Sequence, residues 1–158
     1  MSEYTTNKRL LHKYESFQFS WFILIFIPAE IWISYLFLSQ TGSKPLPLGM
    51  YIAIQVFMVV VCLLFYGMKT TMTEDQMVLR YGIGIIRIKI DLRDVSSSKI
   101  VRNPWYYGLG IRLIPKGMLY NVSGLNAVEL KFKNKERIIR VGSSEVEILK
   151  YELDKRIQ

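Results

Sequence analysis

Two long apolar stretches dominate the first half of the chain. Residues 20–38 (SWFILIFIPAEIWISYLFL) and 50–68 (MYIAIQVFMVVVCLLFYGM) are 19 residues each, and Glu30 is the only charged residue in either. At a helical rise of about 1.5 Å per residue, each would span about 28 Å, which matches the hydrocarbon core of a bilayer, about 30 Å thick. A core helix of a water-soluble protein is rarely apolar around its whole circumference over this length. Both stretches are therefore predicted to cross a membrane.

The connector and the flanking charges predict how the two spans are arranged. Residues 39–49 (SQTGSKPLPLG) hold two glycines and two prolines, which break helices, so a short turn should join two antiparallel spans. Three cationic residues precede the first span and Lys69 follows the second, whereas Lys44 is the only cation in the connector. This asymmetry predicts that both termini are cytoplasmic. A signal peptide is the alternative for the first stretch, but no small-residue cleavage site follows it and a second full span does.

Residues 1–19 are predicted to form a segment at the membrane surface. Leu10, Leu11, Tyr14 and Phe17 recur at roughly helical spacing with cationic residues between them, which is typical of a short interfacial helix. A disordered lead-in is the alternative.

After residue 68 the apolar period changes to two, which is typical of β-strands. Residues 69–73 and 77–82 flank an acidic turn at 74–76, which predicts one hairpin. Asn134-Lys135 supplies the turn of a second hairpin, because Asn tolerates the positive φ that a two-residue hairpin turn needs. Ile138 would be an exposed apolar residue. Further strands are predicted at residues 84–90, 94–101, 111–113, 118–120, 127–133 and 137–141. Short antiparallel strands with one solvent-exposed face are typical of a β-sandwich or a β-barrel.

The chain ends in a predicted amphipathic helix. Ser144 and Glu147 have the spacing of a capping box. An apolar stripe follows at helical spacing, formed by Val146, Leu149, Leu153 and Ile157. This stripe must be buried, most simply against the open end of the β structure.

Residues 105–124 (WYYGLGIRLIPKGMLYNVSG) are the least generic part of the second half. Trp105, Tyr106 and Tyr107 with Arg112 and Lys116 could form a basic and aromatic surface suited to lipid or to a partner. Core packing and turn structure are the alternative for the aromatic residues.

Several motifs in this half resemble bacterial membrane proteins that carry a pleckstrin-homology-like (PH-like) domain after paired transmembrane helices. They are YGLGIR at 107–112, Pro115, Gly117, YNVSG at 120–124, AVEL at 127–130 and VGS at 141–143. The resemblance covers residues 69–158 and implies a strongly bent antiparallel barrel of about seven strands, capped by the C-terminal helix. The expected protein is therefore of the α+β class, with an N-terminal segment (1–19), a transmembrane hairpin (20–68) and a cytoplasmic PH-like domain (69–158). Phosphoinositide-binding members use basic residues in the first turn, but this turn holds Glu74 and Asp75.

Glu30 lies near the middle of the first predicted span, where a carboxylate is costly and often functional. Counted from the cytoplasmic ends, Glu30 and Gln55 lie at depths that differ by about 4.5 Å, within side-chain reach. A hydrogen bond between them would lock the hairpin or a dimer. Ion or proton transport within an oligomer is the alternative.

Charge and composition limit the classes of binding partner and of chemical site that we expect. From Lys69 onward there are 17 Lys and Arg against 10 Asp and Glu, which accounts for +7 of the net charge of +8. A basic domain held beside the cytoplasmic leaflet attracts anionic lipid head groups, whereas membrane attachment argues against nucleic acid. Cys62 and His12 are the only residues of their kinds, so no metal site, cofactor site or nucleophilic triad is expected.

The sequence thus predicts a non-enzymatic protein of the bacterial inner membrane. We expect its domain to dock on a membrane-associated protein or on further copies of the chain. Sensing of anionic lipid is the alternative function, and transport through Glu30 is the third.

Overall fold

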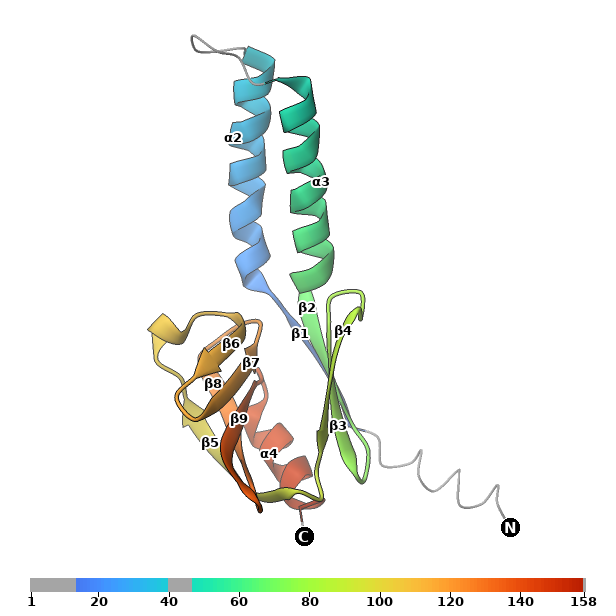
Figure 1. The fold of residues 1–158 in the computed structure, drawn as a ribbon, viewed down its shortest axis with the longest axis vertical. Helices are drawn as coiled ribbons and strands as arrows, with labels where there is room; N and C mark the ends of the chain where they lie inside the picture. The colour runs from blue at the N-terminus through green and yellow to red at the C-terminus, as the bar shows by residue number, and fades with distance from the viewer. Residues whose placement is uncertain (1–13, 40–46, 158) are drawn as a thin grey trace, which may run out of the picture.

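A computed structural model of the chain describes residues 14–39 and 47–157. Its elements, in chain order, are β1 (Tyr14–Phe19), η1 (Trp21–Ile25), α2 (Phe26–Ser39), α3 (Leu48–Phe65), β2 (Gly67–Met72), β3 (Gln76–Tyr81), β4 (Ile86–Asp91), β5 (Val95–Arg102), η2 (Trp105–Tyr107), β6 (Gly110–Ile114), β7 (Gly117–Asn121), β8 (Asn126–Phe132), β9 (Lys135–Gly142) and α4 (Val146–Asp154). The fold class is α+β: two apolar helices project from one end of a β domain, by which we mean the strands together with α4 (Figure 1).

Helices α2 and α3 run side by side beyond the β domain, and in the described part of the chain neither has a buried residue. α3 is 18 residues long and is, within the described residues, the one helix long and apolar enough to cross a membrane. The helical stretch Ile23–Ser39 is also apolar but shorter. Its first turns, in η1, are a tighter 3-10 helix.

The second predicted span ends earlier than the sequence pattern indicated. α3 stops at Phe65, and Gly67 and Met68 belong to β2, where they pair with Phe19 and Gln18 of β1. Met68 is buried in the core of the β domain. The last residues of the apolar stretch therefore belong to a strand and not to the helix. Hydropathy alone does not distinguish residues that face lipid from residues that face a protein core.

The predicted interfacial helix before the first span is wrong where the structure describes it. Tyr14–Phe19 is a strand, β1, paired antiparallel with β2. Burial alternates along its second half, with Gln18 buried between exposed Phe17 and Phe19. Residues 1–13, and with them Leu10 and Leu11, lie outside the described residues.

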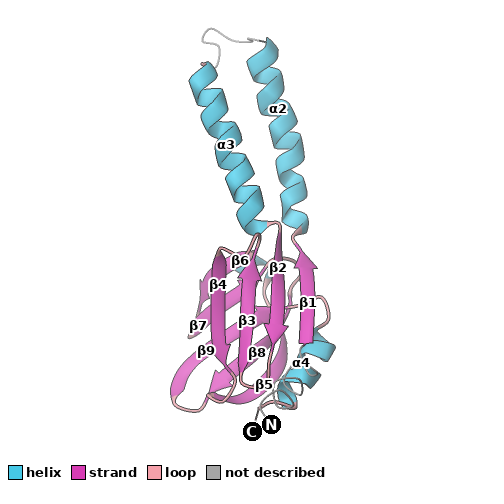
Figure 2. Cartoon of the chain, turned by 90° about the vertical axis from the view of Figure 1, so that its right-hand side faces the viewer, coloured by secondary structure: helices cyan, strands magenta, loops and turns pink. Residues whose placement is uncertain are grey.

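The strands form two sheets and not one closed barrel of about seven strands. The four-stranded sheet has the antiparallel order β1-β2-β3-β4 and faces the viewer in Figure 2. The five-stranded sheet has the order β5-β8-β9-β7-β6. Within it β7 and β9 are parallel, which departs from the expected all-antiparallel arrangement.

The predicted strands occur within a few residues of their expected positions, but two turn details differ. Phe132 pairs with Lys135, so Lys133 and Asn134 form the turn between β8 and β9. Neither has a positive φ; among the described non-glycine residues only Lys116 does, at 68°.

The core lies between the two sheets and is closed by α4 (Figure 1). Leu149 and Leu153 of α4 are fully buried, and Val146 and Ile157 pack against the same cluster, which confirms the predicted apolar stripe. The predicted capping box does not form: the N-cap residue of α4 is Glu145, and it makes no side-chain capping hydrogen bond. Instead the Ser143 hydroxyl accepts a hydrogen bond from the amide of Glu145 over 3.0 Å.

Candidate functional site

The helices and the β domain meet at a hydrogen-bonded junction. The amide of Ser20, just before η1, donates to the carbonyl oxygen of Tyr66, just after α3, over 2.9 Å. This bond continues the β1–β2 ladder, in which Phe19 lies opposite Gly67. The two helices therefore leave from adjacent, paired strands, so the hairpin and the four-stranded sheet are mechanically coupled.

The turn between β3 and β4 packs under the last turn of α3. The amide of Ile83 donates to the carbonyl oxygen of Leu63 over 3.1 Å. Gly82 has a φ of +51°, and a Cβ atom there would lie 2.0 Å from the same carbonyl oxygen. A side chain at this position would push helix and turn apart, so glycine permits the contact.

Two buried side chains connect the same junction to the five-stranded sheet. The Ser20 hydroxyl donates to the carbonyl oxygen of Val122 over 3.2 Å, and Gln18 Nε2 donates to that of Ser123 over 3.1 Å. Both acceptors follow β7. The chain entering the first helix is thus tied to both sheets.

A cavity of about 500 Å³ lies at this junction, and we call it the junction cavity. The helices and their entry contribute Ser20, Ile23, Phe26, Val61 and Phe65, and the domain contributes residues 108–112 and Val122. The volume falls within the usual range of ligand sites, about 300–1,000 Å³. The walls are mostly apolar, and among the described residues no acidic side chain lines the cavity.

Arg112 supplies the positive charge of the junction cavity. Its Nε donates to the carbonyl oxygen of Leu109 over 3.0 Å, which fixes the side chain across the loop before β6. A Cβ atom at Gly108 would lie 3.8 Å from the guanidinium, so the side chain lies against that glycine. Within the described part of the chain, its terminal nitrogens have no hydrogen-bond partner, which leaves them available to an anion.

The predicted aromatic surface directly precedes the cavity-lining loop. η2 exposes 80% of Trp105 and 67% of Tyr106, whereas Tyr107 is partly buried. The rings of Tyr106 and Tyr107 meet edge to face, with centroids 5.2 Å apart. The connection between β5 and β6 that carries η2 lies at the helix-facing side of the β domain (Figure 1).

A polar network that the sequence analysis did not identify contacts η2 and the residues just before it. Arg140 of β9 donates through Nε to Glu129 of β8 over 2.9 Å and through Nη1 to Asn103 over 3.0 Å. Its guanidinium also lies 6.0 Å from the ring centroid of Tyr107. Glu129 and Arg140 are directly opposite each other in the β8–β9 register. The predicted hairpin with its turn at Asn134-Lys135 also places these two residues opposite each other, so its register was a signal for this ion pair.

The helix-facing rim of the β domain exposes further apolar side chains. Ile83 and Ile85, in the β3–β4 turn beneath α3, are 55% and 69% exposed. With η2 they place large apolar side chains on two sides of the helix pair. Trp and Tyr side chains, such as those of η2, are enriched at membrane–water interfaces.

The structure brings together only part of the predicted lipid or partner surface. Arg112 lines the junction cavity, and Trp105, Tyr106 and Tyr107 lie just before it in the chain. Lys116 lies in the turn at the other end of β6 and does not line the cavity. Ser20 and Val122 were not singled out from the sequence, because nothing local shows that the two segments meet.

Glu30 and Gln55 are in contact between the helices. Gln55 Nε2 donates to Glu30 Oε2 over 2.7 Å, and Ser34 and the Tyr51 hydroxyl lie 3.4 Å apart one turn further along. Glu30, Gln55 and Ser34 line a groove of about 750 Å³ between α2 and α3, which Cys62 also lines. Glu30 Oε1 is buried and has no partner among the described residues.

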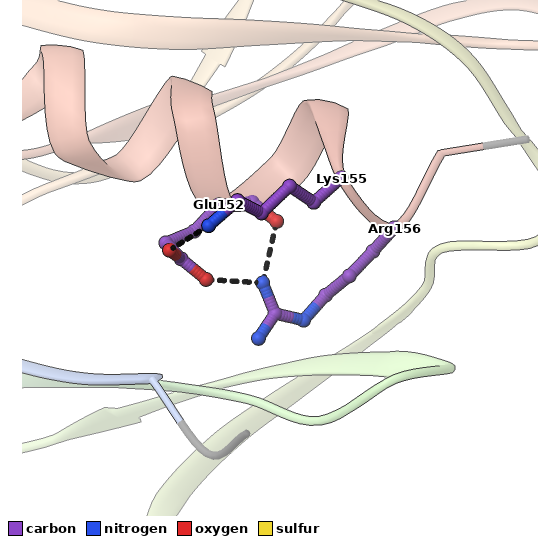
Figure 3. A network of polar contacts seen from close by, with 3 residues as sticks. All are labelled: Glu152, Lys155 and Arg156. Carbon is purple, nitrogen blue, oxygen red and sulfur yellow. Dashed lines mark hydrogen bonds and ion pairs between the residues drawn. The ribbon is translucent and has the colours of Figure 1, made fainter.

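A charged pocket of about 610 Å³ lies near the C-terminal end of α4. It is lined by Glu74, Asp75, Arg93, Lys133, Glu152, Lys155 and Arg156. Arg156 Nη1 donates to both the carboxylate and the backbone carbonyl of Glu152, each over 2.6 Å (Figure 3). The hydrogen bond from Arg156 lowers the pKa of the Glu152 carboxyl. The acidic residues largely neutralise the cationic ones, so the pocket offers no strong anion site.

Within residues 14–39 and 47–157, no group of three His, Cys, Asp or Glu side chains could hold a metal ion. Comparisons with protein-family models, curated proteins and solved structures find no match for this chain.

Proposed function

We propose that this protein is a membrane-anchored binding and assembly module. Helices α2 and α3 cross the bacterial inner membrane as a hairpin, and the β domain lies on the cytoplasmic side. There it docks on a membrane-associated protein or on further copies of the chain. The domain is of the PH-like kind, and its C-terminal helix closing the core between two sheets agrees with that proposal.

The observation that carries this proposal is the junction between helices and sheet. The hydrogen bond from Ser20 to Tyr66 and the contact of Ile83 with Leu63 couple the hairpin to the four-stranded sheet. A domain joined by a flexible linker would sample many orientations, whereas this one presents the same rim to the bilayer. A fixed orientation is useful to a protein that recognises something at the membrane surface.

The first helix of the hairpin, α2, is shorter than α3 and carries Glu30, and a polar contact with α3 explains how this charge could be tolerated in a membrane. The hydrogen bond from Gln55 satisfies one oxygen of Glu30 inside the helix pair. The exposed side chains of Trp21 and Trp105 lie where head groups would be expected, near the start of the first helix and on the domain rim. Cations at both ends of the described hairpin and few in the connector support the cytoplasmic placement.

Site-specific photo-crosslinking in living cells tests the docking function. A photo-reactive residue at Tyr106, in the exposed rim, should yield a discrete protein adduct that mass spectrometry identifies as a partner or as a second copy. The same residue at Arg137, which is exposed on β9, is the matched control and should give a different or weaker pattern. If neither Tyr106 nor the other exposed residues of the helix-facing rim, Trp105, Ile83 and Ile85, gave a protein adduct, a docking role for this rim would be contradicted.

Self-association is favoured over a foreign partner by the groove that holds Glu30. A second copy packed in a two-fold arrangement could cover this groove, so that the faces lined by Glu30, Gln55 and Met58 meet in the two copies. A photo-reactive residue at Met58, which lines the groove, should crosslink two copies. The same residue at Ile52, which is exposed and does not line the groove, should not.

A further inference from the structure

The junction cavity combines two chemistries that rarely meet in a protein-binding surface. One wall is formed by the ends of the two apolar helices, through Phe26, Val61 and Phe65. The opposite wall is the loop before β6 together with the first residues of that strand, which include Arg112. The site therefore has an apolar end, which continues the surface of the membrane helices, and an anion-binding end, which is the cation on the domain side.

We infer that the junction cavity binds one glycerophospholipid of the cytoplasmic leaflet. The lipid phosphate pairs with the terminal nitrogens of Arg112, and an acyl chain lies along Val61 and Phe65. This inference rests on the proposed membrane hairpin, because the cavity meets the head-group layer only if α2 and α3 cross the bilayer.

Charge complementarity supports the phosphate end of the site. The lining contains one cation and no acidic side chain, so a phosphate diester meets an unopposed positive charge. Arg112 is held by its Nε bond to Leu109, and the fork of its two terminal nitrogens remains free of described partners. A planar guanidinium in this state is suited to bidentate phosphate recognition.

The fixed geometry of the junction supports the apolar end. Ser20 is bonded both to Tyr66 and to Val122, so the helix ends and the β6–β7 side of the domain keep their separation. A gap of about 500 Å³ between the apolar helix ends and the Arg112 side of the domain, at head-group depth, is filled most readily by the lipid already surrounding it. A water-soluble phosphate compound would meet the charge but leave the apolar wall uncovered.

The test is native mass spectrometry of the full-length protein, purified in mild detergent and supplied with phosphatidylglycerol. One lipid per chain should remain bound. Diacylglycerol with the same chains should be retained about tenfold less, since it lacks the charge-assisted bond to Arg112. Inorganic phosphate alone should give no adduct. Retention of diacylglycerol as well as phosphatidylglycerol would overturn the inference.

Two variants with matched controls locate the lipid. Arg112→Gln should lower retention about tenfold, whereas Arg102→Gln, exposed on β5 and outside the lining, should leave it unchanged. Val61→Trp should fill the cavity and abolish retention, whereas Val60→Trp, which is exposed to lipid on the same helix, should not. Equal retention by all four variants, or no single-lipid adduct in the native protein, would overturn the proposal.

Carbonate extraction of membranes, run on each variant, separates the two proposals. Protein that stays in the membrane pellet but retains no lipid contradicts the lipid site alone. Protein that appears in the carbonate supernatant contradicts the hairpin itself.

Discussion

The amide of Ser20 and the carbonyl oxygen of Tyr66 are joined by a hydrogen bond of 2.9 Å at the point where one apolar helix begins and the other ends. The bond is the last rung of the β1–β2 ladder. It makes the helix pair an extension of the four-stranded sheet, so the orientation of the β domain follows from that of the hairpin.

Gly82 is the residue that this junction tolerates least well when changed. Gly82→Ala should destabilise the protein, because the new Cβ would lie 2.0 Å from the Leu63 carbonyl oxygen and φ is +51°. Gly84→Ala is the matched control, since Gly84 also has a positive φ, of +88°, but nothing lies within 4 Å of its Cβ position. Both changes carry backbone strain of about 1–2 kcal/mol. Thermal unfolding in detergent should show a clearly larger loss for Gly82→Ala, and equal losses would contradict the close packing.

The Arg140–Glu129 pair should hold the aromatic segment in place. Arg140→Met leaves the carboxylate of Glu129 buried without its partner, which is expected to cost about 3–5 kcal/mol. The double variant with Glu129→Leu removes both charges and should recover most of that loss. Chemical denaturation measures both effects. A double variant no more stable than the single one would contradict the pairing as the source of the effect.

The contact between Glu30 and Gln55 should matter for association more than for insertion. Glu30→Gln keeps an acceptor for Gln55 Nε2 and should leave folding and membrane insertion nearly intact. Glu30→Leu should weaken the association of two copies by about 0.6–2 kcal/mol, the range for hydrogen bonds between membrane helices. Energy transfer between donor- and acceptor-labelled copies in vesicles measures this. Unchanged transfer in Glu30→Leu would exclude the groove as the contact, and loss of Glu30→Gln from the membrane would contradict the structural role.

Acid should weaken the end of α4. The hydrogen bond from Arg156 lowers the pKa of the Glu152 carboxyl in the folded protein below its ordinary value in an unfolded chain. The pair therefore stabilises the fold fully above that value, and the contribution is lost as pH falls through the lower, folded pKa. For a partly exposed pair the effect is below about 1 kcal/mol. Melting temperature against pH should fall less steeply below pH 5 in Arg156→Gln than in the native protein, and parallel curves would contradict this.

The sequence was sufficient where the deciding pattern is local. The alternation of isoleucine with charge in residues 86–90 predicted β4, and the spacing of Leu149 and Leu153 predicted the buried face of α4. Glu30 and Gln55 were placed within reach because two helices of known direction leave little freedom in relative depth.

The sequence was insufficient where two patterns overlap or distant segments meet. Tyr14 and Phe17 fit a helical spacing, but this segment forms a strand because it pairs with β2. A single sequence does not show that pairing. The parallel contact of β7 with β9 partly covers Ile138, which looked exposed, because it pairs with Gly117. The junction cavity needs residues from positions 20 to 122, so its geometry follows only from the assembled fold.

The most direct test of the membrane hairpin is cysteine labelling with a membrane-impermeant maleimide in intact spheroplasts. The background carries Cys62→Ser, with either Leu48→Cys at the start of α3 or Arg137→Cys on β9, both exposed positions. The hairpin predicts that Leu48→Cys is labelled from outside, whereas Arg137→Cys is labelled only after lysis. Labelling of Arg137→Cys in intact spheroplasts, or protection of both positions until lysis, would contradict a hairpin that crosses the membrane with its β domain in the cytoplasm.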